Sequence, residues 1–455
     1  MSRVIRILAC AFVLIFGLSQ TVPSQITAAP VVRPCDGPCH GGHHLPPTKI
    51  QYIIVIVQEN RTPDNLFQGF PGADIASSGQ NSLGKTVTLV PRVLATRYDL
   101  DHSHKGWKTE YDGGKMDGWD LEKSTCPSHK CLPQTAFAYV PKKLVMPYWT
   151  LAQTYTFADK TFQDNQGPSF PAHQFIIAGT STDAVGSKLL AAENLKYHTG
   201  TWQSGSNCGG SPLDKVRMIN PAGNESVTRP PCFEHPTIMD QLDSRNIKWR
   251  YYNATSSGFW SAPDAIKHLH SGPDWANVIT PETTILKDIA SGQLRQVSWV
   301  MPTAAESDHS VSTDGSGPAW VASVVNAVGK SKYWNSTAIF ITWDDWGGWY
   351  DHVKPIIYSS YEVGFRVPLI VVSPYAKRGY VSHVQHQQSS ILHFIETNFG
   401  LPTLGYADAR ADNLADCFNY LQSPTPFAFI PTPGWSARDL AKSELPSNVP
   451  VDDDF

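Results

Sequence analysis

The 455-residue chain has little net charge and no apolar run long enough to cross a membrane. Lys and Arg number 36 and Asp and Glu 40, which gives a formal charge of −4. A nucleic-acid partner requires a basic surface, so this balance argues against nucleic acid. The apolar run Ile7–Leu18 is shorter than the roughly 20 residues of a transmembrane helix, and no other long run follows. We therefore expect no stable membrane anchor.

The N-terminus carries a targeting pattern. Arg3 and Arg6 precede the apolar run, and small residues follow it up to Ala29. These features are typical of a secretory signal peptide, so we assign residues 1–29 to a signal and expect a secreted or periplasmic product. A lipoprotein site at Cys10 is the alternative, but too little apolar sequence precedes it. We divide the remaining chain into a linker over 30–50, one domain over 51–430 and a tail over 431–455.

Cysteine is sparse, with eight in the chain. Export would permit disulfides, and three pairs close in sequence could form them, although spacing leaves the connectivity open. Cys417 would then remain as a buried, inert thiol. The stretch from Cys35 to His44 resembles a metal site, but no second cluster at zinc-site spacing accompanies it, so we favour a glycine-rich linker. The three candidate pairs are Cys35/Cys39, Cys126/Cys131 and Cys208/Cys232.

Short β-branched runs alternate with helix-like segments along the chain. Most of these runs are nearly continuously apolar, which is typical of strands covered on both faces. The alternation predicts an α/β fold with a mostly parallel central sheet and helices on both faces. The expected strands are Tyr52–Val57, Lys248–Tyr252, Gln296–Val300, Ala338–Trp343 and Val367–Val372, and the expected helices are Tyr148–Tyr155, His235–Leu242, Pro318–Gly329 and Ser389–Phe399.

Long loops rich in Gly, Pro, Ser and Trp separate these elements, at 69–85, 100–135 and 198–231. Such loops usually cover a functional site, and we expect them to do so here. The tryptophans outside the expected elements suit an apolar or sugar-bearing substrate, or they fix the loops to the core. Both interpretations stay open at this point. These residues are Trp107, Trp119, Trp202, Trp260, Trp346 and Trp349.

Acidic and amide side chains follow two of the expected strands. Glu59 and Asn60 come after the first strand, and Asp344 and Asp345 after the fourth. Ligands of open α/β sheets bind at the carboxyl ends of the strands, so we expect these four side chains to meet. Two adjacent buried carboxylates need a compensating cation. Their oxygens predict a divalent metal ion, with Ca, Mg, Mn, Zn and Fe left open.

A candidate nucleophile, Ser169, lies in the stretch GPSFP, residues 167–171. The turn residues before the serine and the proline after it predict a helix that begins there. A helix N-terminus attracts phosphate, and a nearby metal would lower the pKa of the hydroxyl and ready it for attack. The simpler alternative is an ordinary N-cap serine. Nearby, Arg61 would contact a substrate anion or pair with Asp64.

The motifs around these residues resemble those of the bacterial phosphoesterase family of phospholipases C and acid phosphatases, a branch of the alkaline-phosphatase-like superfamily. The resemblance runs from Tyr52 to about Tyr420. The family's ENRSFD matches residues 59–64, and its D-x-x-H-S and NGGKMDGF motifs match 99–103 and 112–119. Its nucleophile motif matches 167–171, its late Ser-Glu-His-Pro matches 307–310, and its Asp-Glu-x-Gly-Gly-x-Tyr-Asp-His-Val matches 344–353.

The resemblance also implies roles for single residues. Ser169 would be the nucleophile that becomes phosphorylated. The metal ligands would be Glu59, Asn60, Asp344 and Asp345. Three histidines would surround the transferring phosphoryl group: His102, His309 and His352. Three further residues would contact the substrate: Arg61, Lys115 and Asp308.

Two departures from the family pattern bear on the site. Asp345 replaces the more frequent Glu, which shortens a carboxylate arm. Gln387 and Gln388 stand where the family has Asp and His, and neighbouring His386 is the candidate substitute for that histidine.

These features together predict a secreted, metal-dependent phosphoric ester hydrolase that works through a phosphoserine. Phospholipids and soluble phosphomonoesters compete as substrates, and we favour the phospholipase C type over the acid phosphatase type. The alternative of another class is an exported binding protein that has kept the fold and lost its activity. The intact Ser169 and its acidic partners argue against that alternative, and the oligomeric state stays open.

Overall fold

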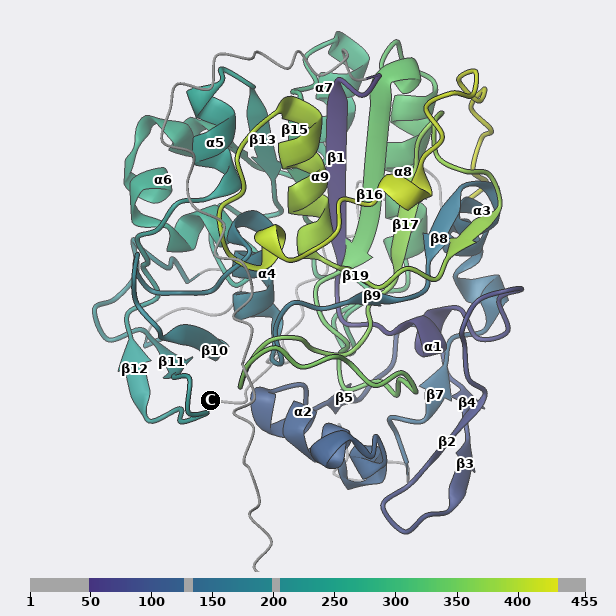
Figure 1. The fold of residues 1–455 in the computed structure, drawn as a ribbon, viewed down its shortest axis with the longest axis vertical. Coiled ribbons are helices and arrows are strands. Elements are labelled where there is room, and N and C mark those ends of the chain that lie inside the picture. The colour runs from purple at the N-terminus through teal and green to yellow at the C-terminus, as the bar shows by residue number, and fades with distance from the viewer. Residues whose placement is uncertain (1–48, 127–133, 199–204, 433–455) are drawn as a thin grey trace, which may run out of the picture. The chain divides into compact units, whose positions relative to one another are not determined.

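The computed structural model describes residues 49–126, 134–198 and 205–432, and its centre is an eight-stranded sheet in the order β14-β13-β15-β1-β16-β17-β8-β18 (Figure 1). Strand β17 runs antiparallel to both of its neighbours, whereas the other adjacent strands pair in parallel. The prediction of a mostly parallel sheet is confirmed. The strands are β1 (Tyr52–Gln58), β8 (Thr156–Ala158), β13 (Trp249–Tyr252), β14 (Val278–Ile279), β15 (Val297–Val300), β16 (Thr337–Trp343), β17 (Leu369–Val372) and β18 (Tyr380–Ser382).

Strand β1 lies in the middle of this sheet, although it is the first strand in the described part of the chain. Val55 pairs with Trp299 on one side and with Phe340 on the other. Residues 53–57 are fully buried. Their unbroken apolar character follows from this position, because both faces of the central strand are covered.

Helices cover both faces of the sheet, as the sequence predicts (Figure 1). One packed group consists of α3 (Met146–Thr154), α7 (Thr284–Ser291) and α8 (Gly317–Gly329), and the other of α4 (Ser169–Ala178), α5 (Ile238–Ser244) and α9 (Ser389–Phe399). The bounds of the strands and helices predicted from the sequence lie within about three residues of the observed bounds. Helix α5 begins later than predicted because Thr237 and Asp240 form a capping box at its start. Strand β17 begins after Pro368, which has no N–H for a strand ladder.

Much of the long segment 100–135 is more regular than a loop. It contains α2 (His104–Tyr111), which Ser103 caps through its side chain. Trp107 of this helix and Trp119 are buried in a second hydrophobic cluster together with Trp346 and Trp349. These tryptophans therefore fix the loops to the body of the protein, and Trp260 is buried as well.

Short elements complete the described chain. The remaining helices are α1 (Pro63–Leu66) and α6 (Lys267–Ser271), and the remaining strands are β2 (Ser78–Gln80), β3 (Thr86–Thr88), β4 (Val90–Pro91), β5 (Asp99–Leu100), β6 (Ser124–Thr125), β7 (Ala138–Tyr139), β9 (Thr161–Phe162), β10 (Leu190–Lys196), β11 (Lys215–Ile219), β12 (Val227–Arg229) and β19 (His386–Gln387). Strands β10, β11 and β12 form a separate antiparallel sheet within the long segment before α5.

One predicted disulfide, Cys208–Cys232, is present. Cys417 is a buried free thiol, as expected, and burial raises its pKa well above the usual value. The proposed signal at 1–29, the Cys35/Cys39 pair and Trp202 lie outside the described residues, as do Cys131 and nearly all of the linker and the tail. Within the described ranges, no helix combines the length and the apolar character that crossing a bilayer would need.

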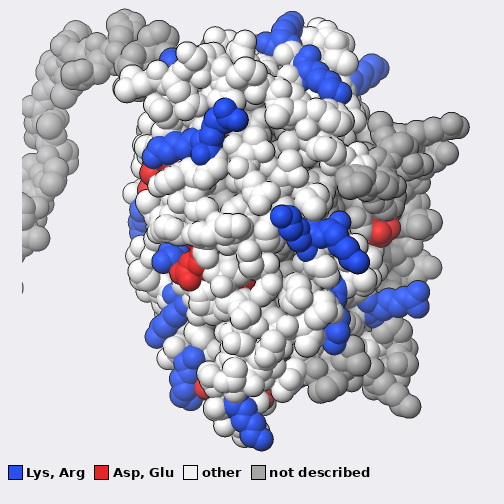
Figure 2. Space-filling view, turned by 90° about the vertical axis from the view of Figure 1, so that its right-hand side faces the viewer, with Lys and Arg blue, Asp and Glu red and all other residues white. Residues whose placement is uncertain are grey.

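Figure 2 shows the face of the molecule that lies on the right of Figure 1. Lys and Arg side chains are spread over its described part singly or in small groups, with uncharged surface between them and a few acidic side chains. The described residues on this face therefore form no continuous basic stripe of the kind that follows a phosphate backbone.

Candidate active site

Strands β1 and β16 end side by side at the lower edge of the sheet in Figure 1, and four polar residues follow these two strand ends. Strands β1 and β16 are paired in parallel, with Gln58 opposite Trp343. Glu59 and Asn60 therefore leave the sheet beside Asp344 and Asp345, and all four are buried. The Asn60 N–H donates to Asp344 Oδ1 at 3.0 Å. The meeting of these strand ends is the arrangement that the sequence predicts.

The backbone at these strand ends is unusual. Asn60 has φ of 60°, a left-handed conformation that Asn tolerates better than most residues. Gly347 follows the aspartate pair with φ of 62°, and its N–H donates to Asp345 Oδ1 at 2.7 Å. A Cβ at Gly347 would lie 2.5 Å from the Cβ of Asn60. Glycine is therefore required where the two chain segments cross.

Ser169 is the first residue of α4, and Pro168 occupies the N-cap position. The structure thus rules out the interpretation of Ser169 as an ordinary N-cap. The Ser169 hydroxyl lies 3.2 Å from Glu59 Oε2 and 3.3 Å from Asp345 Oδ2. It is buried and directed toward the acidic side chains, as a metal-activated nucleophile would be.

His173 is a residue of this site that the sequence analysis missed. It lies four positions after Ser169 on α4, so both side chains share one face of the helix. Its Nε2 is 3.1 Å from Glu59 Oε1 and 3.8 Å from Asp344 Oδ2. Burial lowers the pKa of His173 to about 4, so the ring is neutral at ordinary pH. The Ser-x-x-x-His spacing was the signal that could have identified it.

The acidic side chains need a positive charge that the described protein groups do not provide. Burial, and then the charge of Asp344, raises the pKa of Glu59 well above its usual value. Oδ2 of Asp344 is buried without a hydrogen-bond partner among the described residues. A cation between these carboxylates would stabilise both as anions.

Two histidines define the state of the Asn60 amide. The Nδ1 atoms of His102 and His309 lie 2.6 Å from the backbone carbonyls of Leu100 and Ser310. A carbonyl only accepts, so each Nδ1 carries a proton, and in the neutral ring Nε2 is an acceptor. The Asn60 amide lies 2.9 Å from Nε2 of His102 and 3.0 Å from Nε2 of His309.

The amide of Asn60 can satisfy these histidines in two ways. When its nitrogen donates to them, its oxygen faces Asp344 Oδ1 at 3.0 Å and Glu59 Oε2 at 3.3 Å. Three oxygens at such distances repel unless a cation lies among them. The reversed amide would instead donate to the two carboxylates and require both histidines to donate through Nε2, as imidazolium rings do. The site therefore holds neutral histidines when a divalent ion is bound. The oxygens of Asn60, Asp344 and Glu59 are ligands that suit such an ion.

The buried Arg61 side chain makes its contacts with other groups of the protein. Its guanidinium donates to the backbone carbonyls of Asp308 and Leu94 and to Asn65 Oδ1, and it lies over the ring of Trp349. Burial lowers its pKa to about 10. The alternative of a pair with Asp64 was wrong, because no contact joins the two side chains and Asp64 instead binds other partners.

Asp308, whose carbonyl accepts from Arg61, is also buried. Its Oδ2 accepts from the Tyr148 hydroxyl at 2.9 Å and from Trp343 Nε1 at 2.8 Å. Burial raises its pKa to about 6, although Arg61 opposes this. Asp308 thus connects the loop that carries His309 to the end of strand β16. Lys115, the third predicted substrate contact, is well exposed and forms an ion pair with Asp112 at 2.6 Å.

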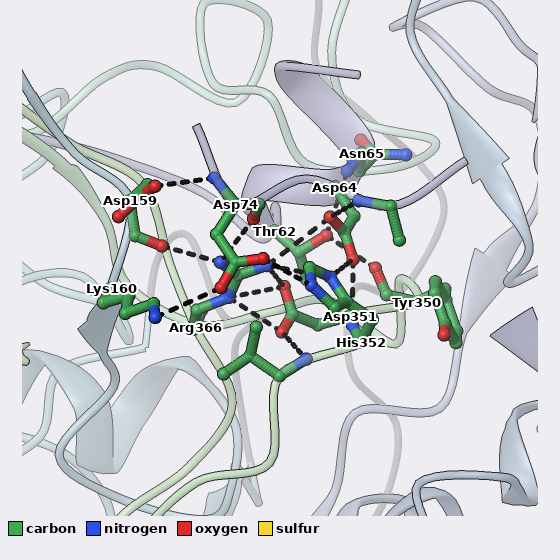
Figure 3. A network of polar contacts seen from close by, with 12 residues as sticks. Thr62, Asp64, Asn65, Asp74, Asp159, Lys160, Tyr350, Asp351, His352 and Arg366 are labelled. Atoms are coloured by element: carbon green, nitrogen blue, oxygen red, sulfur yellow. Dashed lines mark hydrogen bonds and ion pairs between the residues drawn. The ribbon is translucent and has the colours of Figure 1, made fainter. Parts of the chain in front are cut away.

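His352 belongs to a separate polar network (Figure 3). Its Nδ1 lies 2.7 Å from Asp64 Oδ2, and its Nε2 lies 3.0 Å from Asp74 Oδ1. Burial opposes protonation, but the hydrogen bond to Asp64 raises the pKa of His352 to about 9. Both ring nitrogens of His352 thus face carboxylates, whereas His102 and His309 each face a backbone carbonyl through Nδ1 and the Asn60 amide through Nε2.

Arg366 is the centre of that network (Figure 3). Its fully buried guanidinium donates to both carboxylate oxygens of Asp351 and, at 3.4 Å, to Asp64 Oδ1. It also donates to the backbone carbonyls of Asp74 and Asp159. The network ties α1, which follows the Glu59–Asn60 strand end, to the loop after the aspartate pair.

The side chain of Gln388 holds the backbone at the start of the aspartate pair. Its Nε2 donates to the carbonyls of Trp343 at 2.6 Å and of Asp344 at 2.7 Å. His386, the candidate substitute histidine, instead pairs with Asp412 at 2.8 Å and contacts Ser382 at 3.1 Å. The departure from the family pattern at Gln388 therefore places a structural amide at the end of strand β16.

Comparison with known proteins agrees with the sequence motifs. The chain is 23% identical to phospholipase C B of Mycobacterium tuberculosis over 86% of its own length and 81% of that protein. It is 24% identical to non-specific phospholipase C6 of Arabidopsis thaliana, over 84% and 75% of the two chains. A solved protein of the alkaline phosphatase superfamily from Vibrio parahaemolyticus is 10% identical, with a TM-score of 0.37 over 80% of this chain and 70% of that one.

A family match covers most of the domain and includes every strand of the central sheet. Residues 50–402 match the Phosphoesterase family, and this span contains all of the side chains gathered around Asn60 and Ser169. The protein is thus a member of the Phosphoesterase family.

Proposed function

We propose that this protein hydrolyses phosphoric esters of the phospholipase C type, through a phosphoserine formed at Ser169. The observation that carries the proposal is the position of the Ser169 hydroxyl, 3.2 Å from Glu59 and 3.3 Å from Asp345 at the first turn of α4. Family membership and the phospholipase C relatives support the reaction class.

We assign cation binding to four side chains at the strand ends and to the serine hydroxyl. A bound divalent ion would lower the pKa of the hydroxyl and neutralise charge on the phosphoryl oxygens. Glu59 and Asp345 lie within hydrogen-bond reach of the hydroxyl and can hold its proton. The ligands would be Glu59, Asn60, Asp344 and Asp345.

The reaction proceeds in two displacements at phosphorus. The Ser169 oxygen forms a bond to phosphorus while the ester oxygen leaves with its alcohol, and water later breaks the phosphoserine bond. The leaving alcohol needs a proton. His352 is held by Asp64 and Asp74, so we assign delivery of this proton to His102 or His309 at the Asn60 amide. Nε2 of either ring is an acceptor in the metal-bound state, so it would first take up a proton from water and then pass it to the alcohol.

We favour a phospholipid as the substrate, which would give diacylglycerol and a phosphorylated head group. The names of the relatives support this choice over a soluble phosphomonoester. The tryptophans do not bear on it, because those of the second hydrophobic cluster are buried. We also propose that the protein is exported, on the targeting pattern of residues 1–29.

The proposal is tested with purified protein, a chromogenic phosphodiester, a phosphomonoester and phosphatidylcholine vesicles, each with and without chelator. We expect chelator-sensitive hydrolysis and release of diacylglycerol. Hydrolysis of the monoester alone would favour the acid phosphatase alternative. An absence of turnover on all three substrates, with each divalent metal supplied, would leave the non-catalytic binding protein as the better interpretation.

A further inference from the structure

Glu59 and Asp344 each present their two carboxylate oxygens to different neighbours. Oε2 of Glu59 faces Ser169 and the Asn60 amide, whereas Oε1 faces His173 at 3.1 Å. Oδ1 of Asp344 accepts from the Asn60 N–H, whereas Oδ2 lies 3.8 Å from His173. The buried Nε2 of His173 therefore lies within 3.8 Å of one oxygen from each of the two carboxylates.

The spacing of these three atoms is close to that of ligands around one ion, with one separation longer than a tetrahedral angle gives. Donors that bind a metal at about 2.1 Å lie about 3.0 Å apart at a right angle and about 3.4 Å apart at a tetrahedral angle. The observed separations from Nε2 of His173 are 3.1 Å and 3.8 Å. Ligand atoms of Glu59, His173 and Asp344 all lie within 4.8 Å of one another.

A hydrogen bond from His173 to Glu59 is the simpler explanation, and it accounts for only one of the two distances. At 3.8 Å, Nε2 is too far from Asp344 Oδ2 to donate to it. That oxygen would then stay buried without a partner, at the cost that a buried anion carries. A cation bound by all three groups satisfies Asp344 Oδ2 and His173 Nε2 together, and it leaves the proton of the neutral ring on Nδ1, which is buried without a hydrogen-bond partner among the described residues.

We propose that His173 is a ligand of the active-site cation through Nε2. This inference rests on the proposed function and deepens it, because an imidazole nitrogen changes which ion the site prefers. Oxygen-only sites suit Ca²⁺ and Mg²⁺, whereas a mixed nitrogen and oxygen set favours transition-series ions such as Mn²⁺ and Zn²⁺. The site is therefore selective for an ion of the second class.

Pulsed electron paramagnetic resonance of the Mn²⁺-loaded full-length protein tests this directly. We expect modulation from a directly bound imidazole nitrogen in the wild type and its loss in His173→Gln. His235→Gln is the matched control, since His235 is also a buried histidine with one unpartnered ring nitrogen but contacts the Pro236 carbonyl. This control should retain the signal.

Metal selectivity gives a second readout that does not depend on turnover. The ratio of Zn²⁺ to Mg²⁺ affinity, measured by competition with a chromogenic chelator, should fall at least about 100-fold in His173→Gln. Thermal unfolding of the metal-free proteins shows whether the variant folds; if it does not, His173→Asn replaces it.

Each outcome decides one question. Nitrogen modulation that is absent from the wild type, or that persists in His173→Gln, overturns the assignment, and so does an unchanged affinity ratio. Modulation that depends on His173 in a protein without phosphate ester turnover would instead overturn the proposed function and leave the ligand in place.

Discussion

The hydroxyl of Ser169 lies 3.3 Å from the carboxylate of Asp345, although 176 positions separate the two residues in the chain. One stands at the start of helix α4 and the other just beyond the end of strand β16. Neither element could hold a reactive serine beside a carboxylate alone. The contact exists because the helix packs with its N-terminus at the edge where the parallel strands end.

Removal of the Ser169 hydroxyl should abolish turnover without loss of the fold. We expect Ser169→Ala to lower kcat by at least about 10⁴-fold, as removal of a covalent nucleophile does. Thr62→Ala is the control, because Thr62 is the other hydroxyl near the strand end. Its hydroxyl donates to the Tyr350 carbonyl, and its oxygen accepts from the Asn65 N–H, so Thr62 is a structural group. A wild-type rate in Ser169→Ala would show that Ser169 is not the nucleophile. A comparable loss of kcat in folded Thr62→Ala would make Thr62 a candidate for that role.

Metal binding should displace a proton. Burial and the neighbouring carboxylates raise the pKa of Glu59 well above its usual value in the metal-free protein, whereas a ligand must be ionised. Calorimetric titration at pH 7 in buffers of different ionisation enthalpy should show a net release of protons on metal binding. Binding should also tighten as pH rises through the metal-free pKa of Glu59. A heat of binding that is independent of the buffer would contradict the assignment of Glu59.

The aspartate pair should determine metal content. Asp344→Asn and Asp345→Asn each replace a buried anion by an amide of the same shape, so we expect lower metal content and lower turnover together. Elemental analysis of the purified, dialysed proteins measures the first and ester hydrolysis the second. Full occupancy in both variants would count against these two residues as ligands.

Gln388 should matter for metal affinity although it does not contact the proposed ion. Gln388→Leu removes the donor of the Asp344 carbonyl and leaves the Trp343 carbonyl with only the long 3.4 Å bond from the Thr342 hydroxyl, which should cost about 1–3 kcal/mol of stability. The loosened strand end should weaken metal binding by about 10–100-fold. Gln422→Leu is a close control, because Gln422 also donates to two backbone carbonyls, those of Pro374 and Ala376. If both variants bind metal equally well, Gln388 is not a positioning residue.

His352 should make stability depend on alkaline pH. Its pKa is raised in the folded state to about 9 from 6.5, so its contribution is fully present below pH 6.5 and is lost as pH rises through 9. We expect His352→Gln to be less stable than the wild type at pH 6, by at most about 3 kcal/mol. The difference in unfolding free energy between the wild type and this variant should be smaller at pH 10. Urea unfolding at both pH values measures it, and an unchanged gap would show that the imidazolium is not the stabilising form.

The meeting of the strand ends was predictable because it depends on local patterns. Fully apolar runs identify the buried strands, and parallel strands that pair in one sheet end at one edge. Glu59, Asn60, Asp344 and Asp345 therefore had to lie close together once β1 and β16 were neighbours. Their roles as ligands stay predictions, as does that of Ser169.

The remaining contacts depend on tertiary packing, which spacing does not reveal. His352 directly follows Asp351 in a motif shared with the family, yet Arg366 draws both residues into the network with Asp64. Lys115 sits in another shared motif, and its long side chain extends into solvent beside Asp112. Only the helical spacing of His173 carried usable information.

The central position of the first strand has a consequence during synthesis. Ile53 pairs with Val297 and Tyr52 with Thr337, so β1 has no sheet partner until more than half of the chain has been made. At the usual rate of translation this interval is on the order of ten seconds or more. An unpaired window of aliphatic residues is prone to self-association. A charged residue introduced at Val55 should therefore reduce aggregation of the nascent chain. It should also destabilise the folded protein, because Val55 is fully buried in the central sheet.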